Sequence, residues 1–314
     1  MKTLVEAIRY FEDEQACIDT VASMRWEDGE ATCPKCNSNN VLWLKNQKRW
    51  KCREKGCAKQ FSVKVGTIFE DSALPLDKWL VAMWLVGNCK NGISSYEVAR
   101  DLGITQKSAW FMLHRIRVAM REDHGIHTTG TGHANPIEID ETFVGGNPKN
   151  KHVGKRNVES DKKSIVLGML NRQTRQVRAK VIPNVKRETL QAEILKNVGF
   201  NAHVYTDGFS SYEGIDKFKN FTHKTVNHVN EYVNGRVHTQ GIENFWSCLK
   251  RTLNGTYVAV EPFHLDAYVD EQVFRYNTRK THSNETRLAK VLSQVAGRRL
   301  TYKELTGKEG QTAF

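Results

Sequence analysis

Four of the seven cysteines fall into two close pairs, and this spacing constrains the fold of the chain more than any other feature. The pairs lie in the segments CPKC and CREKGC, with 15 residues between them. Each pair suits a tight turn that presents two thiolates to one ion, and four thiolates complete a tetrahedral zinc site. The sequence therefore predicts one structural Zn²⁺, and its ligands are Cys33, Cys36, Cys52 and Cys57.

The residues around these pairs predict a zinc ribbon over 31–70. Apolar and polar residues alternate in NVLWLKNQKRWKC around a turn at Asn46 and Gln47, as in a small hairpin, and KQFSVKVGTIF reads as a further strand. The alternative, two disulfides, requires an oxidising compartment for which nothing else in the chain argues. The remaining cysteines lie in apolar helical contexts and are expected to be small core residues: Cys17, Cys89 and Cys248.

The charge of the chain points to an anionic partner. The formal net charge is +12 and the pI is about 9.3. Nine Lys or Arg residues but one acid lie between Cys33 and Lys64, and a second basic cluster runs from Lys149 to Lys163. A solvated surface is the plainer interpretation of such runs, although ordinary surfaces mix their signs. Within the ribbon, basic residues and exposed-looking aromatic residues suggest contact with DNA, and a protein partner is the alternative: Arg49, Lys51, Trp43, Trp50 and Phe61.

The segment 71–124 carries a second DNA-binding pattern. After an apolar helix that begins near Pro75, the stretch GISSYEVARDLGITQKSAWFMLHRIRVAM is typical of a helix-turn-helix, with its turn at Gly103. Ser94 or Ser95 would cap the first helix, and Thr105 the second. The start of the second helix contacts bases in such motifs, so the candidate DNA-binding residues are Gln106, Lys107, Ser108 and Arg115. An ordinary helical hairpin is the alternative.

Three carboxylates in the second half of the chain suit a metal site: Asp140 in IEIDETFVGG, Asp207 in VYTDGFSS and Glu243 in TQGIENFW. We expect the first two to end strands and the third to open an amphipathic helix, on which Lys250 follows two turns later. Two divalent cations on a phosphodiester require acidic oxygens from separate elements, because one stretch of backbone cannot surround both ions. Taken singly, each acid has a plainer role as a turn former, a helix cap or a surface ion pair.

The order of elements around these acids predicts an α/β domain. Three strands are followed by a helix, a strand, a short helix, a strand and a long helix from about Thr239, which suits a mixed sheet with helices on its faces. If the strands that carry Asp140 and Asp207 are neighbours, both acids meet at one edge. We therefore expect a multidomain chain with these parts: an N-terminal helical segment 1–30, the ribbon 31–70, the helix-turn-helix region 71–124, a linker 125–135, the α/β domain 136–290 and a C-terminal tail 291–314.

The segments IDETFVGG, YTDGFSSY and HTQGIENFWSCLKRTLNGTY, in this order, resemble the DDE transposases of bacterial insertion sequences. The cysteine ribbon and the later run VEPFHLDAYVDEQVFRYNTRKT are similar to the members of that family that begin with a zinc ribbon. The resemblance covers about residues 20–290. It implies a ribonuclease-H-like catalytic core with Asp140, Asp207 and Glu243 as its metal-binding triad.

Several neighbours of the triad leave alternatives open. Asn244 is the alternative third residue, although a carboxylate binds a hard divalent cation better than a neutral amide does. Glu138 and Glu141 are expected to face the opposite side of the strand from Asp140, as bystanders, although Glu141 lies near enough to the strand end to approach a metal. Secondary candidates are His238, for a phosphate or the attacking water, Lys250, for a DNA phosphate, and Trp246, which either packs the helix or stacks on a flipped base.

The resemblance also implies cofactors and partners. It implies two Mg²⁺ or Mn²⁺ ions in the catalytic site, binding to the terminal repeats of an element and to target DNA, and a homodimer or higher oligomer. With no membrane-length apolar stretch and no signal-peptide core, the chain is expected to be cytoplasmic and, in a bacterium, associated with the nucleoid. The alternatives are a transcription regulator with an inactive nuclease-like domain and a repair or resolving nuclease with the same core.

Overall fold

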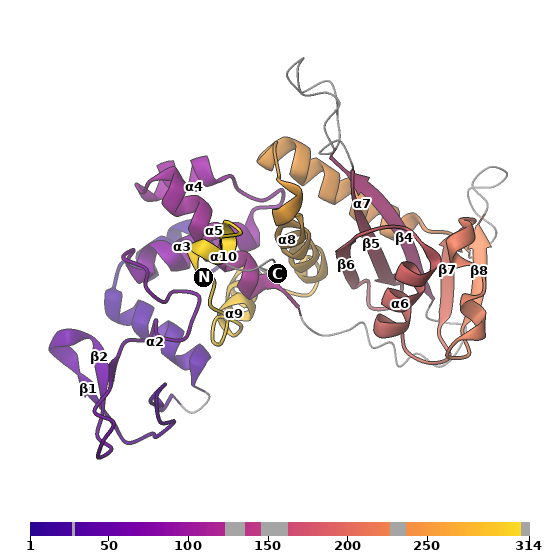
Figure 1. Cartoon of the computed structure of the whole chain (residues 1–314). Coiled ribbons are helices and arrows are strands. Elements are labelled where there is room, and N and C mark those ends of the chain that lie inside the picture. Colours follow the sequence, from indigo (N-terminus) through magenta and orange to yellow (C-terminus); the bar gives the residue numbers. More distant parts are fainter. Residues whose placement is uncertain (27–28, 123–135, 146–162, 227–236, 309–314) are drawn as a thin grey trace. The chain divides into compact units, whose positions relative to one another are not determined.

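The computed structural model describes residues 1–26, 29–122, 136–145, 163–226 and 237–308, in two compact units (Figure 1). The first unit comprises Met1–Arg121 together with Lys280–Phe314, and the second comprises Glu122–Arg279. The chain thus returns to its first unit at Lys280, whereas we expected the α/β domain to run to residue 290. The predicted linker and nearly all of the basic cluster from Lys149 to Lys163 lie outside the described residues.

A buried helix, α3 (Leu76–Asn88), forms the centre of the first unit, because its residues are apolar on almost every side. Helices from both ends of the chain pack against it, which explains why the C-terminal segment belongs to this unit. The helices around it are α1 (Leu4–Phe11), α2 (Glu14–Arg25), α4 (Ser95–Leu102), α5 (Gln106–Met120) and α9 (Asn284–Leu292), and α10 (Tyr302–Leu305) follows.

The predicted helix-turn-helix geometry is present in α4 and α5, which pack against each other. Ser94 caps α4 in a capping box with Glu97, and the side chain of Thr105 caps α5. Gly103 lies between the helices with φ of 60°, a left-handed conformation that glycine adopts without a side-chain clash. Local sequence signals therefore fix both the turn and the start of the second helix.

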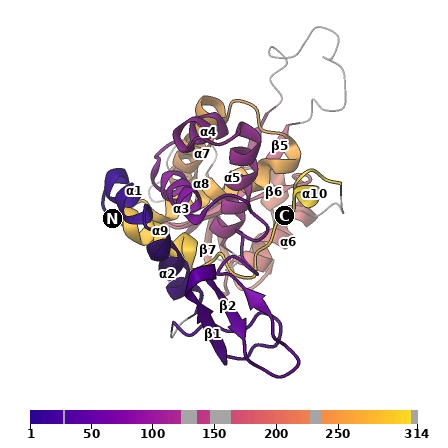
Figure 2. The ribbon, with the colours of Figure 1, turned by 90° about the vertical axis from the view of Figure 1, so that its left-hand side faces the viewer.

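The ribbon is a three-stranded antiparallel sheet, and in Figure 2 its first two strands lie below the helices of this unit. Its strands are β1 (Val41–Leu44), β2 (Arg49–Cys52) and β3 (Gln60–Phe61). The aromatic residues that we expected to be exposed pack together instead: Trp50 lies 4.4 Å from Trp43 and 6.0 Å from Phe61, between ring centroids, and Phe61 is 2% exposed. This correction follows from the small size of the ribbon, which gathers its large apolar side chains on one face.

A five-stranded mixed sheet forms the second unit, in the order β6-β5-β4-β7-β8. The strands β4, β5 and β6 are antiparallel neighbours, whereas β7 runs parallel to both β4 and β8. The bounds are β4 (Ile137–Val144), β5 (Ser164–Asn171), β6 (Val177–Ile182), β7 (His203–Asp207) and β8 (Thr222–Val226). The predicted mixed sheet is thus confirmed.

Helices cover both faces of this sheet. On one face, α7 (Gln240–Thr252) packs over β4 and β5, and α8 (Leu265–Thr278) packs over β6. A separate apolar core on the other face includes α6 (Arg187–Asn197) and the short turns after β7 (Figure 1). The strand order with three antiparallel and two parallel strands is that of the ribonuclease-H-like fold, as the resemblance implied. None of the helices in the described part of the chain is long and apolar enough to cross a membrane.

Candidate zinc and carboxylate sites

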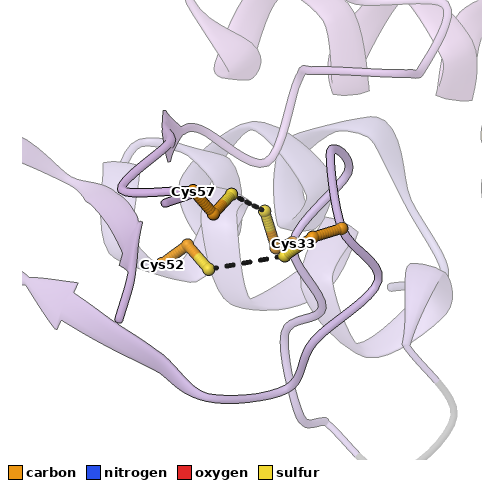
Figure 3. A group of neighbouring side chains, drawn as sticks. Cys33, Cys52 and Cys57 are labelled. Atoms are coloured by element: carbon orange, nitrogen blue, oxygen red, sulfur yellow. Dashed lines mark hydrogen bonds between the residues drawn. The ribbon is translucent and has the colours of Figure 1, made fainter. Parts of the chain in front are cut away.

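The four cysteines of the ribbon converge on one point, and their sulfur atoms all lie within 4.8 Å of one another (Figure 3). The distances from Cys33 to Cys57 and from Cys36 to Cys52 are both 3.6 Å between sulfurs. A Zn–S bond of about 2.3 Å in a tetrahedral site places the sulfurs about 3.8 Å apart, so the cluster has the size that Zn²⁺ requires. The predicted zinc ligands therefore form a structural zinc site.

The thiols of this cluster are shifted in different directions: the pKa of Cys33 is lowered, whereas hydrogen bonding and burial raise the pKa values of Cys36 and Cys52. Burial raises the pKa of the Cys33 thiol, but hydrogen bonds from the backbone N–H groups of Lys35 and Cys36 outweigh it and bring the pKa to about 7. A thiol with this pKa is partly thiolate at neutral pH, which is the form that binds zinc.

The fold brings Asp140 and Asp207 to the same level of the sheet. The parallel pairing of β4 with β7 places Glu138 opposite Tyr205, and two residues further along each strand lie the two aspartates. Asp207 ends β7, as predicted, but Asp140 lies in the middle of β4 and does not end it. The strand continues beyond Asp140 because β5 pairs with it as far as Val144.

Asp140 faces α7, where Trp246 is its hydrogen-bond partner. The indole Nε1 of Trp246 donates to Oδ2 of Asp140 over 2.9 Å, and the ring is 5% exposed, so Trp246 packs the helix as expected. The ring lies against Gly168, which pairs with Asp140 across β4 and β5. A Cβ at Gly168 would come within 2.5 Å of the indole, so only glycine leaves room for this arrangement.

A cluster of like charges surrounds Asp140. Burial raises the pKa of Asp140 to about 7, and the nearby carboxylates of Glu141 and Asp207 add to this rise, although the Trp246 hydrogen bond opposes it. The pKa of Glu141 is also raised, by burial first and by Asp207 next. Glu141 points to the other face of the sheet from Asp140, as expected, and it accepts a hydrogen bond from the hydroxyl of Tyr212.

The third predicted acid lies at the start of α7. Glu243 accepts a 2.8 Å hydrogen bond from the hydroxyl of Thr239, and its side chain is on the exposed part of the helix. Asn244 lies within 3.5 Å of the hydroxyl of Tyr276 on α8. Among the described residues, only the four cysteines place three or more metal-ligand atoms within 4.8 Å of one another. The carboxylate oxygens of Asp140, Asp207 and Glu243 therefore do not all lie within that distance of one another.

The expectation for Glu138 is wrong. Side chains alternate along a strand, so residues two apart share a face, and Glu138 lies on the same face as Asp140. Its side chain is fully buried and accepts hydrogen bonds from Nε of Arg172 and from the backbone N–H of Ile242 in α7. Glu138 is therefore part of the contact between β4 and α7.

The two basic candidates near the triad differ in their surroundings. His238 precedes α7, and its Nδ1 lies 3.7 Å from Glu138. Partial burial and then the guanidinium of Arg172 lower the pKa of His238 below its usual value, so the ring is mainly neutral at pH 7. Lys250 is exposed on α7.

Most of the candidate DNA-binding residues are accessible, but Arg115 is not. Its side chain belongs to the core: the residue is 3% exposed, its guanidinium donates to the backbone carbonyl of Glu70, and it lies over the rings of Trp79 and Phe111. Arg115 lies on the third turn of α5, where the helix is buried, and not on the first turn. Its side chain is therefore not accessible to DNA. Arg49, Lys51 and Lys107 are exposed, and Gln106 and Ser108 are half-buried at the start of α5.

Sequence reasoning missed the roles of Glu138 and Gly168. A glycine in the interior of an otherwise apolar strand indicates close approach of another group, so Gly168 could have predicted that a side chain packs against this strand. The period of two along β4 could likewise have placed Glu138 on the face of Asp140. The partner of Asp140, Trp246, is 106 residues away, and no local pattern specifies such a pair.

Two family models match the chain. Residues 132–277 match the ISXO2-like transposase domain, and residues 12–60 match the transposase zinc-ribbon domain. A protein in the transposable element ISH50 of Halobacterium salinarum is 26% identical over 265 residues, which cover 79% of this chain and 85% of that protein. A transposase-like protein of Haemophilus influenzae is 33% identical over 103 residues, which cover 33% of this chain and 82% of that protein.

A solved structure is also similar in part. The catalytic core domain of BIV integrase matches with a TM-score of 0.31 and 14% identity, covering 46% of this chain and 84% of the integrase core.

Proposed function

Because the chain belongs to the ISXO2-like transposase family, we propose that it binds the ends of an insertion sequence and cuts and joins DNA with Asp140, Asp207 and Glu243 as its catalytic acids. The observation that carries this proposal is the placement of Asp140 and Asp207 at one level of neighbouring parallel strands, with α7 packed over the strand that carries Asp140. This arrangement brings acids that are distant in the sequence to one side of the sheet.

The donor set suits divalent cations. Burial raises the pKa of Asp140 and of Glu141, and neighbouring carboxylates add to the rise: Glu141 and Asp207 act on Asp140, and Asp207 acts on Glu141. Carboxylate oxygens are the ligands that Mg²⁺ prefers in proteins. Two bound Mg²⁺ or Mn²⁺ ions would activate the attacking oxygen and stabilise the leaving oxygen of a phosphodiester. Trp246 would keep Asp140 in a fixed orientation while it binds metal.

The helix geometry favours Glu243 over Asn244 as the third acid. Successive residues of an α-helix turn by about 100°, so Glu243 lies about 60° from Trp246 around the axis, whereas Asn244 lies about 160° away. Trp246 points at Asp140, and Lys250 shares the Glu243 side of the helix. Asn244 instead points toward Tyr276 of α8, which packs over β6 on the far side of β4 from β7.

The remaining residues of the site would handle DNA and protons. Lys250, exposed two turns after Glu243, would pair with a DNA phosphate. His238 is neutral at pH 7 and lies beside the start of α7, so its free ring nitrogen would accept a proton or orient the attacking water. The reaction needs no covalent protein intermediate: water first frees a 3′-hydroxyl, which then attacks the target strand.

The first unit would bring the DNA to this site. One face of the ribbon sheet presents Arg49 and Lys51 beside Leu42 and Gln60, while the aromatic side chains occupy the other face. Lys107 is exposed on the first turn of α5, the part of a recognition helix that reaches base edges. We propose that the ribbon (31–70) and the helix-turn-helix region (71–124) recognise the terminal repeats, and that a dimer pairs the two ends for the second unit.

The test is incubation with the DNA that flanks the gene, in Mg²⁺ or Mn²⁺, with cut positions and joined products mapped. We expect Glu243→Gln to lower cleavage at least 100-fold, because the amide replaces a charged metal ligand, and Asn244→Ala to retain activity within about threefold. The reverse pattern would transfer the role to Asn244. Cleavage without joined products would indicate a nuclease instead of a transposase.

A further inference from the structure

The start of α7 is held by an acid from β4, and not by its own cap residue. Thr239 occupies the N-cap position, but its side chain makes no capping hydrogen bond. Its hydroxyl donates to Glu243 instead, over 2.8 Å. The first backbone N–H groups of a helix have no partner within the helix, so a buried helix start needs an acceptor from elsewhere.

Glu138 supplies this acceptor. Its Oε2 accepts from the backbone N–H of Ile242, the third residue of α7, over 2.9 Å. Its Oε1 accepts from Nε of Arg172 over 2.5 Å, and Arg172 also donates to the backbone carbonyl of His238, just before the helix. A negative charge at this end of a helix is further favoured by the helix dipole.

The side chain of Glu138 is also closely packed against the backbone of α7. A Cβ at Gly241 would come within 2.7 Å of Oε2 and 3.0 Å of Oε1 of Glu138. Neither oxygen can retreat freely, because one is held by Ile242 and the other by Arg172. The absence of a side chain at Gly241 therefore lets the carboxylate reach the helix backbone.

We propose that Glu138 is a positioning residue, which caps α7 from the strand that carries Asp140 and so fixes Glu243 relative to that aspartate. Glu138 and Asp140 lie two residues apart on one face of β4, and each holds α7 by one hydrogen bond, to Ile242 and to Trp246. Because Glu138 acts as the cap, the hydroxyl of Thr239 remains available to hold Glu243. This inference rests on the proposed role of Glu243 in metal binding.

The test compares Glu138→Gln and Gly241→Ala with wild type in the full chain. We expect both variants to require about 10- to 100-fold more Mn²⁺ for half-maximal cleavage, the range found when a group that orients a metal ligand is lost. Faster amide hydrogen exchange over residues 239–246 should accompany this change. The Gly241→Ala variant separates the two effects, because alanine favours a helix more than glycine does and would otherwise slow this exchange.

Glu271→Gln is the matched control. Glu271 is also fully buried and paired with an arginine, Arg275, but it lies on α8. Its loss should lower stability without changing the Mn²⁺ requirement. A folded Glu138→Gln variant with wild-type exchange in α7 or a wild-type Mn²⁺ requirement would overturn the inference, as would an equal shift in Glu271→Gln. If wild type itself does not cut DNA, the proposed function fails, and the exchange data alone still decide whether Glu138 anchors α7.

Discussion

Asp140 combines two requirements that oppose each other in the metal-free protein. It faces the buried side of α7 and accepts a hydrogen bond from an indole, yet it lies near two other carboxylates. Burial and repulsion favour its protonated form, whereas a metal ligand has to be ionised. At the scale of single residues, the proposed metal site therefore lowers the stability of the metal-free fold.

This conflict predicts an unusual dependence of stability on pH. The pKa of Asp140 is about 7 in the folded protein and about 4 when unfolded, so the folded state binds more protons between these values. Stability should thus fall as pH rises from 4 to 7, opposite to a salt-bridged aspartate. Without added magnesium, we expect Asp140→Asn to be more stable than wild type at pH 8, on the order of 2 kcal/mol, and to lose this advantage at pH 4.

Chemical denaturation of both proteins at the two pH values measures this difference. An advantage of Asp140→Asn that is the same at pH 4 and pH 8 would show that Asp140 does not titrate in this range.

At the scale of elements, the packing of α7 on the sheet orients Asp140. The indole of Trp246 fills the space above Gly168, so β5 takes part in orienting Asp140 although it carries none of the three acids. A change at Gly168 should therefore affect catalysis through Trp246, without touching DNA or metal.

We expect Gly168→Ala to destabilise the protein by about 1 to 3 kcal/mol, as overpacking of a core does, and to reduce cleavage at saturating Mn²⁺. Thermal unfolding and cleavage rates measure the two effects. Gly255→Ala is the control, since a Cβ there meets nothing within 4 Å. Equal stabilities of the two variants would mean that the indole can move away from Gly168 without cost.

Helices, strands and the zinc site could be predicted because their sequence patterns are local. Contacts between residues far apart in the sequence could not be predicted. The caps of α4 and α5, the strands of the α/β domain and the four cysteines follow from patterns within a few residues. Arg115 was misplaced because a basic residue on a recognition helix looks the same in the sequence whether it faces DNA or the carbonyl of Glu70. Glu138 was expected on the wrong face of β4, because residues two apart on a strand share a face and Glu138 therefore lies on the face of Asp140.

At the scale of the whole molecule, the proposed DNA-binding and catalytic functions fall in different units. The zinc site lies in the first unit, and the three acids lie in the second. The ribbon is too small to fold by packing alone, so its structure should depend on the metal, whereas the mixed sheet has apolar cores on both faces.

We therefore expect Cys36→Ser to lose zinc and to bind terminal-repeat DNA at least tenfold more weakly, while the second unit stays folded. Zinc content, DNA affinity and hydrogen exchange over β4 to β8 measure these outcomes. Cys248→Ser, outside the zinc site on α7, is the control for loss of a thiol. Faster exchange throughout the sheet of Cys36→Ser would indicate that the units do not fold separately.

The claim that most needs a direct test is that Asp140 and Asp207 act together in cleavage. The measurement is Mn²⁺-dependent nicking of terminal-repeat DNA by wild type, Asp140→Asn and Asp207→Asn, with DNA affinity measured in parallel. We predict that each variant binds the DNA like wild type but cuts it at least 1,000-fold more slowly, since each loses a charged metal ligand. Cleavage at the wild-type rate in either variant would contradict the account.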